Sequence, residues 1–153
     1  MLKRHTVWLW IAVVLLLLTG AIHSISLFIT PTPGNETERQ LLGLMANYKL
    51  DMGPGFRPTM GNLLTALSSC FTFLWLLAGL TIAYLLKKKV APDILRGVVA
   101  INLLVLGASF IVNLIFTFLL PIVLTGLCVL FLGAGLIAIP NSSTSDKTGE
   151  RDH

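Results

Sequence analysis

Among the polar side chains in or just beside the apolar stretches of this sequence, we select five as candidates to bind a ligand: His23, Arg57, Asn62, Thr65 and Asn113. Arginine binds phosphate and carboxylate groups through its planar guanidinium, and histidine changes its charge near neutral pH. Amide and hydroxyl groups add neutral hydrogen bonds. The set therefore predicts a polar binding site, and we assign none of its members to catalysis.

Sequence motifs for catalysis and metal binding are missing. There is no Walker loop, no HExxH pattern, no nucleophile elbow and no group of His, Cys, Asp and Glu with ligand spacing. No apolar stretch contains a formal charge, whereas a proton- or cation-coupled transporter normally needs an intramembrane carboxylate. Cys70 and Cys128 do not form a CxxC motif. We therefore expect no metal and no cofactor.

The composition is that of a membrane protein. Of the 153 residues, 55% are hydrophobic and 12% are charged, whereas soluble domains have about 25% charged residues. Residues 58–86 carry no formal charge and are followed by Lys87, Lys88 and Lys89. About 20 apolar residues cross the roughly 30 Å hydrocarbon core. This stretch therefore predicts a span, and the lysines fix its end on the cytoplasmic side.

Two further apolar regions predict three more spans. The first follows a basic amino terminus, but it is longer than the about 7–15 residues of a signal-peptide core and no A-x-A site follows. Residues 97–139 would measure about 65 Å as one helix, so we expect them to fold back at Pro121. The predicted spans are residues 7–29, 59–86, 97–120 and 122–139.

The predicted fold is therefore all-α: one four-helix transmembrane bundle over residues 1–140. Apolar residues at helical spacing predict a short amphipathic helix in the first outer loop, with Thr37 as its N-cap. Residues 141–153 are expected to form a disordered cytoplasmic tail. The apolar stripe of the loop helix consists of Leu41, Leu44, Met45, Tyr48 and Met52.

The distribution of basic residues predicts that both termini are cytoplasmic. Eight of the eleven Lys and Arg residues flank ends that we assign to the cytoplasm. Because they flank spans and do not line one polar face, we expect no binding of nucleic acid. The eight residues are Lys3, Arg4, Lys87, Lys88, Lys89, Arg96, Lys147 and Arg151.

The polar residues of the spans fall at similar depths in the outer half of the membrane. At 1.5 Å per residue, His23 lies about 9 Å from the outer end of its span, and Asn113 lies at a similar depth. Asn62 and Thr65 belong to the same half, with Arg57 just above. If these faces turn inward, they form a shallow polar pocket under the amphipathic loop. The alternatives are hydrogen bonds between helices, a neutral structural histidine and an interfacial anchor at Arg57.

Several short motifs in the first half of the sequence resemble a family of small bacterial four-span membrane proteins of unknown function. These motifs are Gly20-xx-His23, Met52-Gly53, Phe56-Arg57 and Gly61. The resemblance covers most of the chain up to about residue 86. It implies a bundle in the bacterial inner membrane and supplies no activity, and it points again to His23 and Arg57.

Three functional hypotheses follow. The first is a non-enzymatic membrane protein that binds a lipid-like ligand, or the helix of a partner, at the outer-leaflet pocket. The second is a structural subunit of a homo- or hetero-oligomer that packs through small-residue helix faces. The third, least favoured because no partner carboxylate is present, is a membrane enzyme that uses His23 as acid or base.

Overall fold

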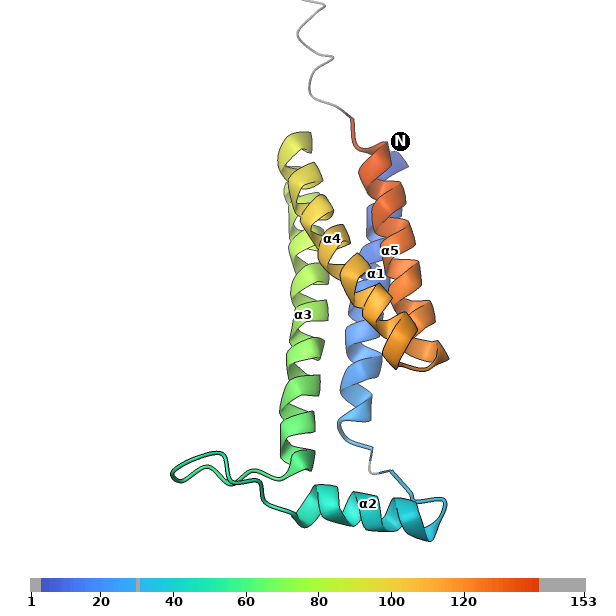
Figure 1. Ribbon diagram of the computed structural model, residues 1–153. Coiled ribbons are helices and arrows are strands. Elements are labelled where there is room, and N and C mark those ends of the chain that lie inside the picture. The colour runs from blue at the N-terminus through green and yellow to red at the C-terminus, as the bar shows by residue number, and fades with distance from the viewer. Residues whose placement is uncertain (1–3, 30, 141–153) are drawn as a thin grey trace, which may run out of the picture. The chain divides into compact units, whose positions relative to one another are not determined.

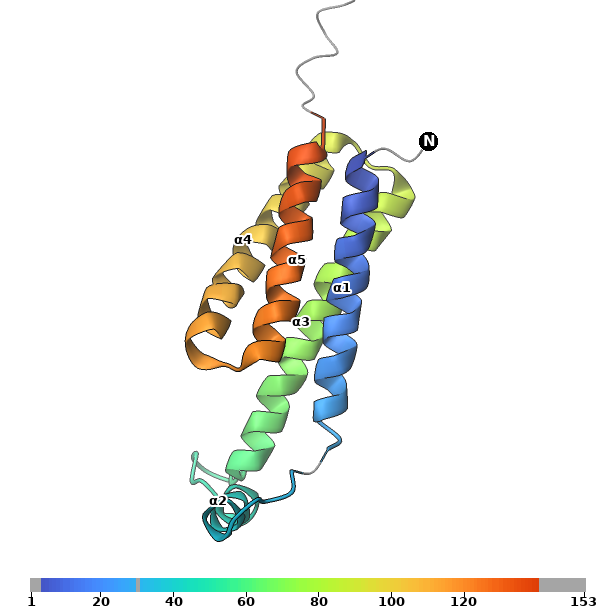
Figure 2. The ribbon, with the colours of Figure 1, turned by 90° about the vertical axis from the view of Figure 1, so that its right-hand side faces the viewer.

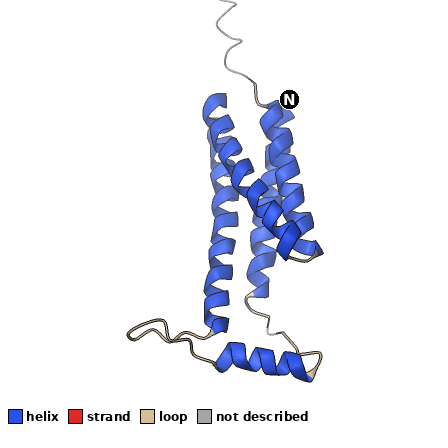
Figure 3. Cartoon of the chain, in the orientation of Figure 1, coloured by secondary structure: helices blue, strands red, loops and turns tan. Residues whose placement is uncertain are grey.

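The computed structural model describes residues 4–29 and 31–140, which contain five α-helices (Figures 1 and 3). They are α1 (Arg4–Ser26), α2 (Glu36–Asn47), α3 (Met60–Lys88), α4 (Pro92–Phe116) and α5 (Leu119–Ala138). All but α2 are long and apolar enough to cross a membrane. The all-α fold with four spans and a short helix in the first loop is thus confirmed. The predicted tail, residues 141–153, lies outside the described residues.

The exposed surface of the long helices is apolar, as lipid contact requires. Leu104, Phe116 and Ile137 are 76%, 77% and 86% exposed. Soluble proteins rarely show large continuous apolar surfaces of this kind. In a bilayer, the same side chains contact lipid tails. Length, composition and surface together describe a multi-pass membrane protein.

The described chain divides into two compact units. Unit 1 holds residues 4–19 and 76–140, and unit 2 holds residues 20–75. Helices α1 and α3 therefore each contribute one part to unit 1 and one part to unit 2. The prediction of a single domain over residues 1–140 stays a prediction.

Unit 1 packs its helices closely through glycines. A Cβ atom added at Gly79 of α3 would lie 2.9 Å from the Cδ2 atom of Leu17, and one added at Gly135 of α5 would lie 2.8 Å from the Cγ atom of Leu9. Real Cβ atoms essentially never come this close. Glycine therefore lets α3 and α5 approach α1 more closely than any other residue would allow.

One end of unit 1 gathers the start of α1, the turn between α3 and α4, and the end of α5 (Figures 1 and 2). There the Arg96 guanidinium donates a hydrogen bond to the carbonyl of Ile139. That carbonyl follows the last residue of α5, where helix carbonyls lack intrahelical partners. Arg96 thereby ties the start of α4 to the end of α5.

The turn between α4 and α5 lies at Thr117 and Phe118, so the predicted break at Pro121 is wrong. The backbone of Thr117 is extended, and its hydroxyl donates a 2.8 Å hydrogen bond to the Asn113 carbonyl. Pro121 lies in the first turn of α5, where its missing N–H costs no helical hydrogen bond. Helix α4 therefore ends four residues before the predicted Leu120.

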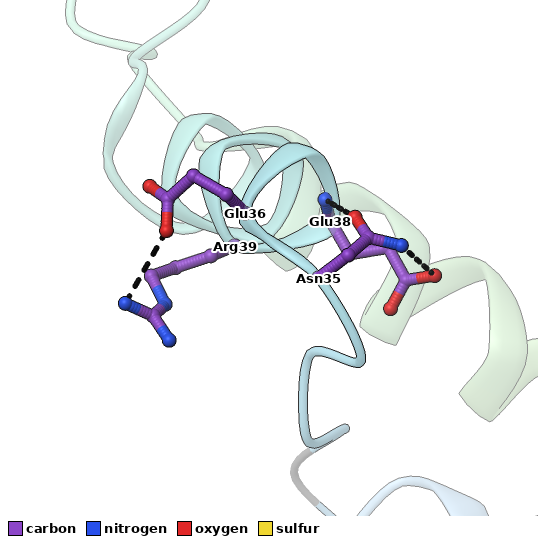
Figure 4. Close-up of polar contacts among 4 residues, drawn as sticks. All are labelled: Asn35, Glu36, Glu38 and Arg39. Atoms are coloured by element: carbon purple, nitrogen blue, oxygen red, sulfur yellow. Dashed lines mark hydrogen bonds and ion pairs between the residues drawn. The ribbon is translucent and has the colours of Figure 1, made fainter.

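In unit 2, α2 begins with a reciprocal cap (Figure 4). The Asn35 Oδ1 atom accepts from the Glu38 N–H at 2.8 Å, and the Glu38 carboxylate accepts from the Gly34 N–H at 2.6 Å. This arrangement satisfies the orphan N–H of Glu38 and resembles a capping box, except that the carboxylate accepts from the residue before the N-cap. The N-cap is thus Asn35, and the prediction of Thr37 was wrong because Thr37 lies inside the first turn.

Residues 48–59 form a short hairpin that the sequence analysis did not predict. Leu50 donates from its N–H to the Pro58 carbonyl at 2.9 Å, and Met52 to the Phe56 carbonyl at 3.2 Å. The tip uses Gly53 at φ 110°, a backbone angle that residues with a Cβ rarely adopt. Met52, which we predicted in the stripe of the loop helix, therefore lies in this hairpin.

Candidate functional site

The structure divides the five predicted site residues between the two units. His23, Arg57, Asn62 and Thr65 belong to unit 2, and Asn113 belongs to unit 1. The convergence of all five on one pocket therefore stays a prediction. Each residue has a local environment of its own, and these environments differ in what they leave available for a ligand.

Asn113 joins α4 to α5. Its amide nitrogen donates to the Thr125 hydroxyl at 3.3 Å, and that hydroxyl donates in turn to the Pro121 carbonyl. Thr125 is only 1% exposed. A hydroxyl buried among apolar groups without a hydrogen bond costs about 1–3 kcal/mol on protein scales. Asn113 thus has the role of a hydrogen-bonding contact between neighbouring helices, which was the alternative interpretation of its polar stripe.

His23 lies beside an aromatic ring of α3. Its ring centroid is 6.4 Å from that of Phe71, and the two planes meet edge to face at 82°. Counting back from Leu86, the last residue before the lysines, Phe71 lies about 22 Å along α3.

Asn62 and Thr65 lie on an exposed side of α3. The buried residues of this helix, Thr72, Trp75, Gly79 and Ile82, define its packed side. At 100° per residue, Asn62 lies about 120° around the helix from the middle of that side, and Thr65 about 60°. Phe71 lies about 180° from Asn62 by the same count. The His23 ring therefore lies against the side of α3 that is opposite to Asn62.

The three asparagines of the long helices differ in whether their side-chain amides donate a hydrogen bond within the described chain. The Asn102 amide donates to the Val98 carbonyl at 2.8 Å, and Asn113 donates to Thr125. The Asn62 backbone N–H donates to the Thr59 hydroxyl at 3.2 Å. Its side-chain amide, like the Thr65 hydroxyl, has no hydrogen-bond partner in the described part of the chain. These two groups are free to bind something else.

Arg57 lies in the hairpin, opposite Asp51. Their charged atoms are 3.9 Å apart, and the two side chains are 71% and 73% exposed. Ion pairs with this exposure contribute about 0–1 kcal/mol, so the pair does not hold the guanidinium firmly. Arg57 remains accessible just before the start of α3.

The sequence analysis missed one buried polar contact in unit 1. The Thr19 hydroxyl donates to the Leu15 carbonyl at 2.7 Å and lies 3.9 Å from the sulfur of Cys128, which is fully buried. A hydroxyl bonded to the preceding turn leaves no donor for a ligand. Within the described residues, no three His, Cys, Asp or Glu side chains form a group that could hold a metal ion. No sequence pattern predicts the Thr19–Cys128 contact, because the two residues lie 109 positions apart.

No family model, curated protein or solved structure matches this chain. The resemblance to small bacterial four-span membrane proteins therefore stays a prediction. The function has to be argued from the chemistry of the residues alone.

Proposed function

We propose that this chain is a non-enzymatic membrane protein that binds a lipid-like ligand in the outer leaflet, with the polar head of the ligand at Asn62 and Thr65. The observation that supports the proposal is that both side chains are exposed on a membrane-length helix and have no hydrogen-bond partner among the described residues. An exposed amide and an exposed hydroxyl without a partner in the chain can bond to the polar head of a ligand.

The depth of these groups fits the head of an amphiphile. Counted from Leu86 at 1.5 Å per residue, Thr65 lies about 32 Å and Asn62 about 36 Å along α3. With a core of roughly 30 Å, both lie at the start of the headgroup layer. Below them on the same side of the helix, Phe73 and Leu80 are 67% and 58% exposed. A ligand with its polar head at Asn62 and Thr65 and its apolar tail along Phe73 and Leu80 matches this order.

The proposal includes the orientation in the membrane. One end of unit 1 carries Arg4, Lys87, Lys88, Lys89 and Arg96, with Asp93 as the one acidic residue described there. An excess of Lys and Arg marks the cytoplasmic side of a membrane protein. Both ends of the described chain then face the cytoplasm, and Asn62 faces the outer leaflet. The membrane is the bacterial inner membrane, as the resemblance implies.

Native mass spectrometry of the gently extracted protein tests the proposal. Wild type should retain a lipid-sized adduct, and the Asn62→Leu/Thr65→Val variant should lose it. Each hydrogen bond is worth about 1 kcal/mol, which corresponds to a factor of about five in affinity. Asn102→Leu is the matched control, because its amide is already bonded within α4. His23→Ala and Arg57→Ala test two of the other predicted contacts in the same experiment.

The alternative is a structural subunit in which the helix of a partner bonds to Asn62. It is favoured by Gly107 and Gly133, where an added Cβ atom would meet nothing within 4 Å. Small residues of this kind allow close helix contact in membranes. An oligomer mass without adduct, lost in Asn62→Leu, would replace the ligand proposal with this one. An adduct retained by the Asn62→Leu/Thr65→Val variant would show that the ligand binds elsewhere.

A further inference from the structure

Two amphipathic elements follow each other between α1 and α3. The first is α2, in which Leu41, Leu44, Met45 and Tyr48, its C-cap, fall within an arc of about 100°. Leu41 and Leu44 are 55% and 63% exposed. None of the residues of α2 is buried, so this apolar arc has no complete cover within the described chain.

The second element is the hairpin, whose two faces differ in polarity. Residues directly opposite in an antiparallel pair point to the same face. Met52 and Phe56 are one such pair, joined by a 3.2 Å backbone hydrogen bond, and they are 60% and 72% exposed. Asp51 and Arg57 form the next pair and point to the other face, where their charged groups lie 3.9 Å apart. The hairpin thus has one apolar face and one charged face.

Helix α2 is fixed against the start of α3, and the hairpin leads directly into that start. An added Cβ atom at Gly61 would lie 3.2 Å from the Met45 carbonyl oxygen, so the backbone of α2 lies directly on the first turn of α3. Met45 belongs to the apolar arc and is half-buried. Helix α2 runs across the direction of α3 in Figure 1 and is seen nearly end-on in Figure 2. The apolar arc therefore includes the side of α2 that meets the spanning helix.

The length of α3 sets the level of both elements. Its 29 residues measure about 43 Å, which matches the about 40–45 Å of a bilayer with its headgroups. If the lysine end marks one surface, the start of α3 lies at the other. Helix α2 and the hairpin then lie at the headgroup surface, parallel to the membrane plane.

The charge of this segment is balanced. Between residues 31 and 59, three acidic residues offset three basic ones. Attraction to anionic lipids scales with the number of basic residues near the surface, so a segment with no net charge gains little from it. Contact with a membrane must then come from apolar area. The six charged residues are Glu36, Glu38, Asp51, Arg39, Lys49 and Arg57.

We propose that residues 36–59 form a single membrane-interface platform, whose apolar sides lie against the outer lipid surface around the start of α3. The platform needs no anionic lipid. It continues the lipid contact of the spans on either side of it, and it does not depend on a ligand at Asn62. Failure of the ligand experiment would therefore leave the platform unaffected, and failure of the platform would leave the ligand site unaffected.

Spin labels at matched positions test the platform. Leu44→Cys and Met52→Cys label the apolar sides, and Asn47→Cys and Lys49→Cys label the polar sides of the same two elements. The full chain carries Cys70→Ala because Cys70 is exposed, while Cys128 is buried. The chain without an introduced cysteine controls for unwanted labelling. The labelled proteins are placed in nanodiscs of phosphatidylcholine, with or without added phosphatidylglycerol.

The readout is the ratio of accessibility to oxygen, which dissolves in lipid, and to a water-soluble nickel complex. We expect a ratio several-fold higher at 44 and 52 than at 47 and 49, unchanged by phosphatidylglycerol. Equal ratios on the two sides would overturn the proposal. So would a difference that appears only with phosphatidylglycerol. If the labels at 44 and 52 were shielded from both reagents, and their spectra were broadened by dipolar coupling between copies, a second chain would cover this face.

Discussion

Replacing Gly135 with alanine tests how closely α5 packs against α1. The new Cβ atom would lie 2.8 Å from the Leu9 Cγ atom and still closer to its Cδ2 atom. Leu9 is fully buried, so its side chain has no open space to turn into. Overpacking of a buried site costs about 1–3 kcal/mol. Alanine itself is about 0.8–1.0 kcal/mol more favourable than glycine inside a helix, which offsets part of this cost.

Gly133→Ala provides the matched control. It lies on the same helix and gains the same helix propensity, but its Cβ atom would meet nothing within 4 Å. The difference between the two variants therefore isolates the steric clash. We expect the free energy of unfolding of Gly135→Ala to be lower than that of Gly133→Ala by about 1–3 kcal/mol.

The assay is titration of the purified protein from mild detergent into dodecyl sulfate, followed by circular dichroism. Truncation at Leu9 removes the atoms that the new Cβ would meet. In a Leu9→Ala background, the additional change Gly135→Ala should therefore cost nothing further. Equal stability of Gly135→Ala and Gly133→Ala, or an unchanged cost in the Leu9→Ala background, would refute the close packing of α5 on α1.

Three further predictions concern unit 1 and use the same titration. A double-mutant cycle of Asn113→Ala and Thr125→Val should give a coupling free energy of about 0.6 kcal/mol, the average for hydrogen bonds between membrane helices; additive effects would contradict the bond. Arg96→Ala should cost about 1.5–3 kcal/mol because the end of α5 loses a charged donor; no loss would contradict the cap. Lys89 has φ 51°, so Lys89→Gly should stabilise by about 1 kcal/mol, whereas Lys88→Gly should destabilise; the same sign for both would contradict this.

The four spans were predictable because their length and lack of charge are properties of the chain itself. The turn between α4 and α5 was not, because no polar residue separates the two helices. Pro121 was taken as the break, but proline fits within the first turn of a helix as well as before it. Thr117 is the C-cap of α4, and its hydroxyl donates a hydrogen bond to the Asn113 carbonyl.

The loop between α1 and α3 shows a similar limit. Tyr48 and Met52 are spaced like residues on successive turns of a helix, and this pattern hid the alternation of Leu50, Met52 and the residues around them. Gly53-Pro54-Gly55 is a sequence that ends a helix, and it is equally the turn of a hairpin. For the cap, Asn35 followed three residues later by Glu38 was the better signal.

The candidate site was predictable residue by residue, but not in its geometry. A helical wheel groups Asn62, Thr65 and Thr72 on one face, and it does not say which edge of that face packs. In the structure, Thr72 is buried while Asn62 and Thr65 are exposed. The position of His23 near the end of α1 followed from counting along one helix. Its neighbour Phe71 did not, because the register between two helices depends on packing that the sequence does not display.

Reporter fusions test most directly the central claim that four helices cross the membrane with both ends of the chain inside. Alkaline phosphatase is active only outside the cytoplasm. Green fluorescent protein fluoresces in the cytoplasm, but not when it is exported in unfolded form. We expect active phosphatase when it is inserted at Pro54, and fluorescence without phosphatase activity when the reporters follow residue 140. Active phosphatase after residue 140 would contradict the account.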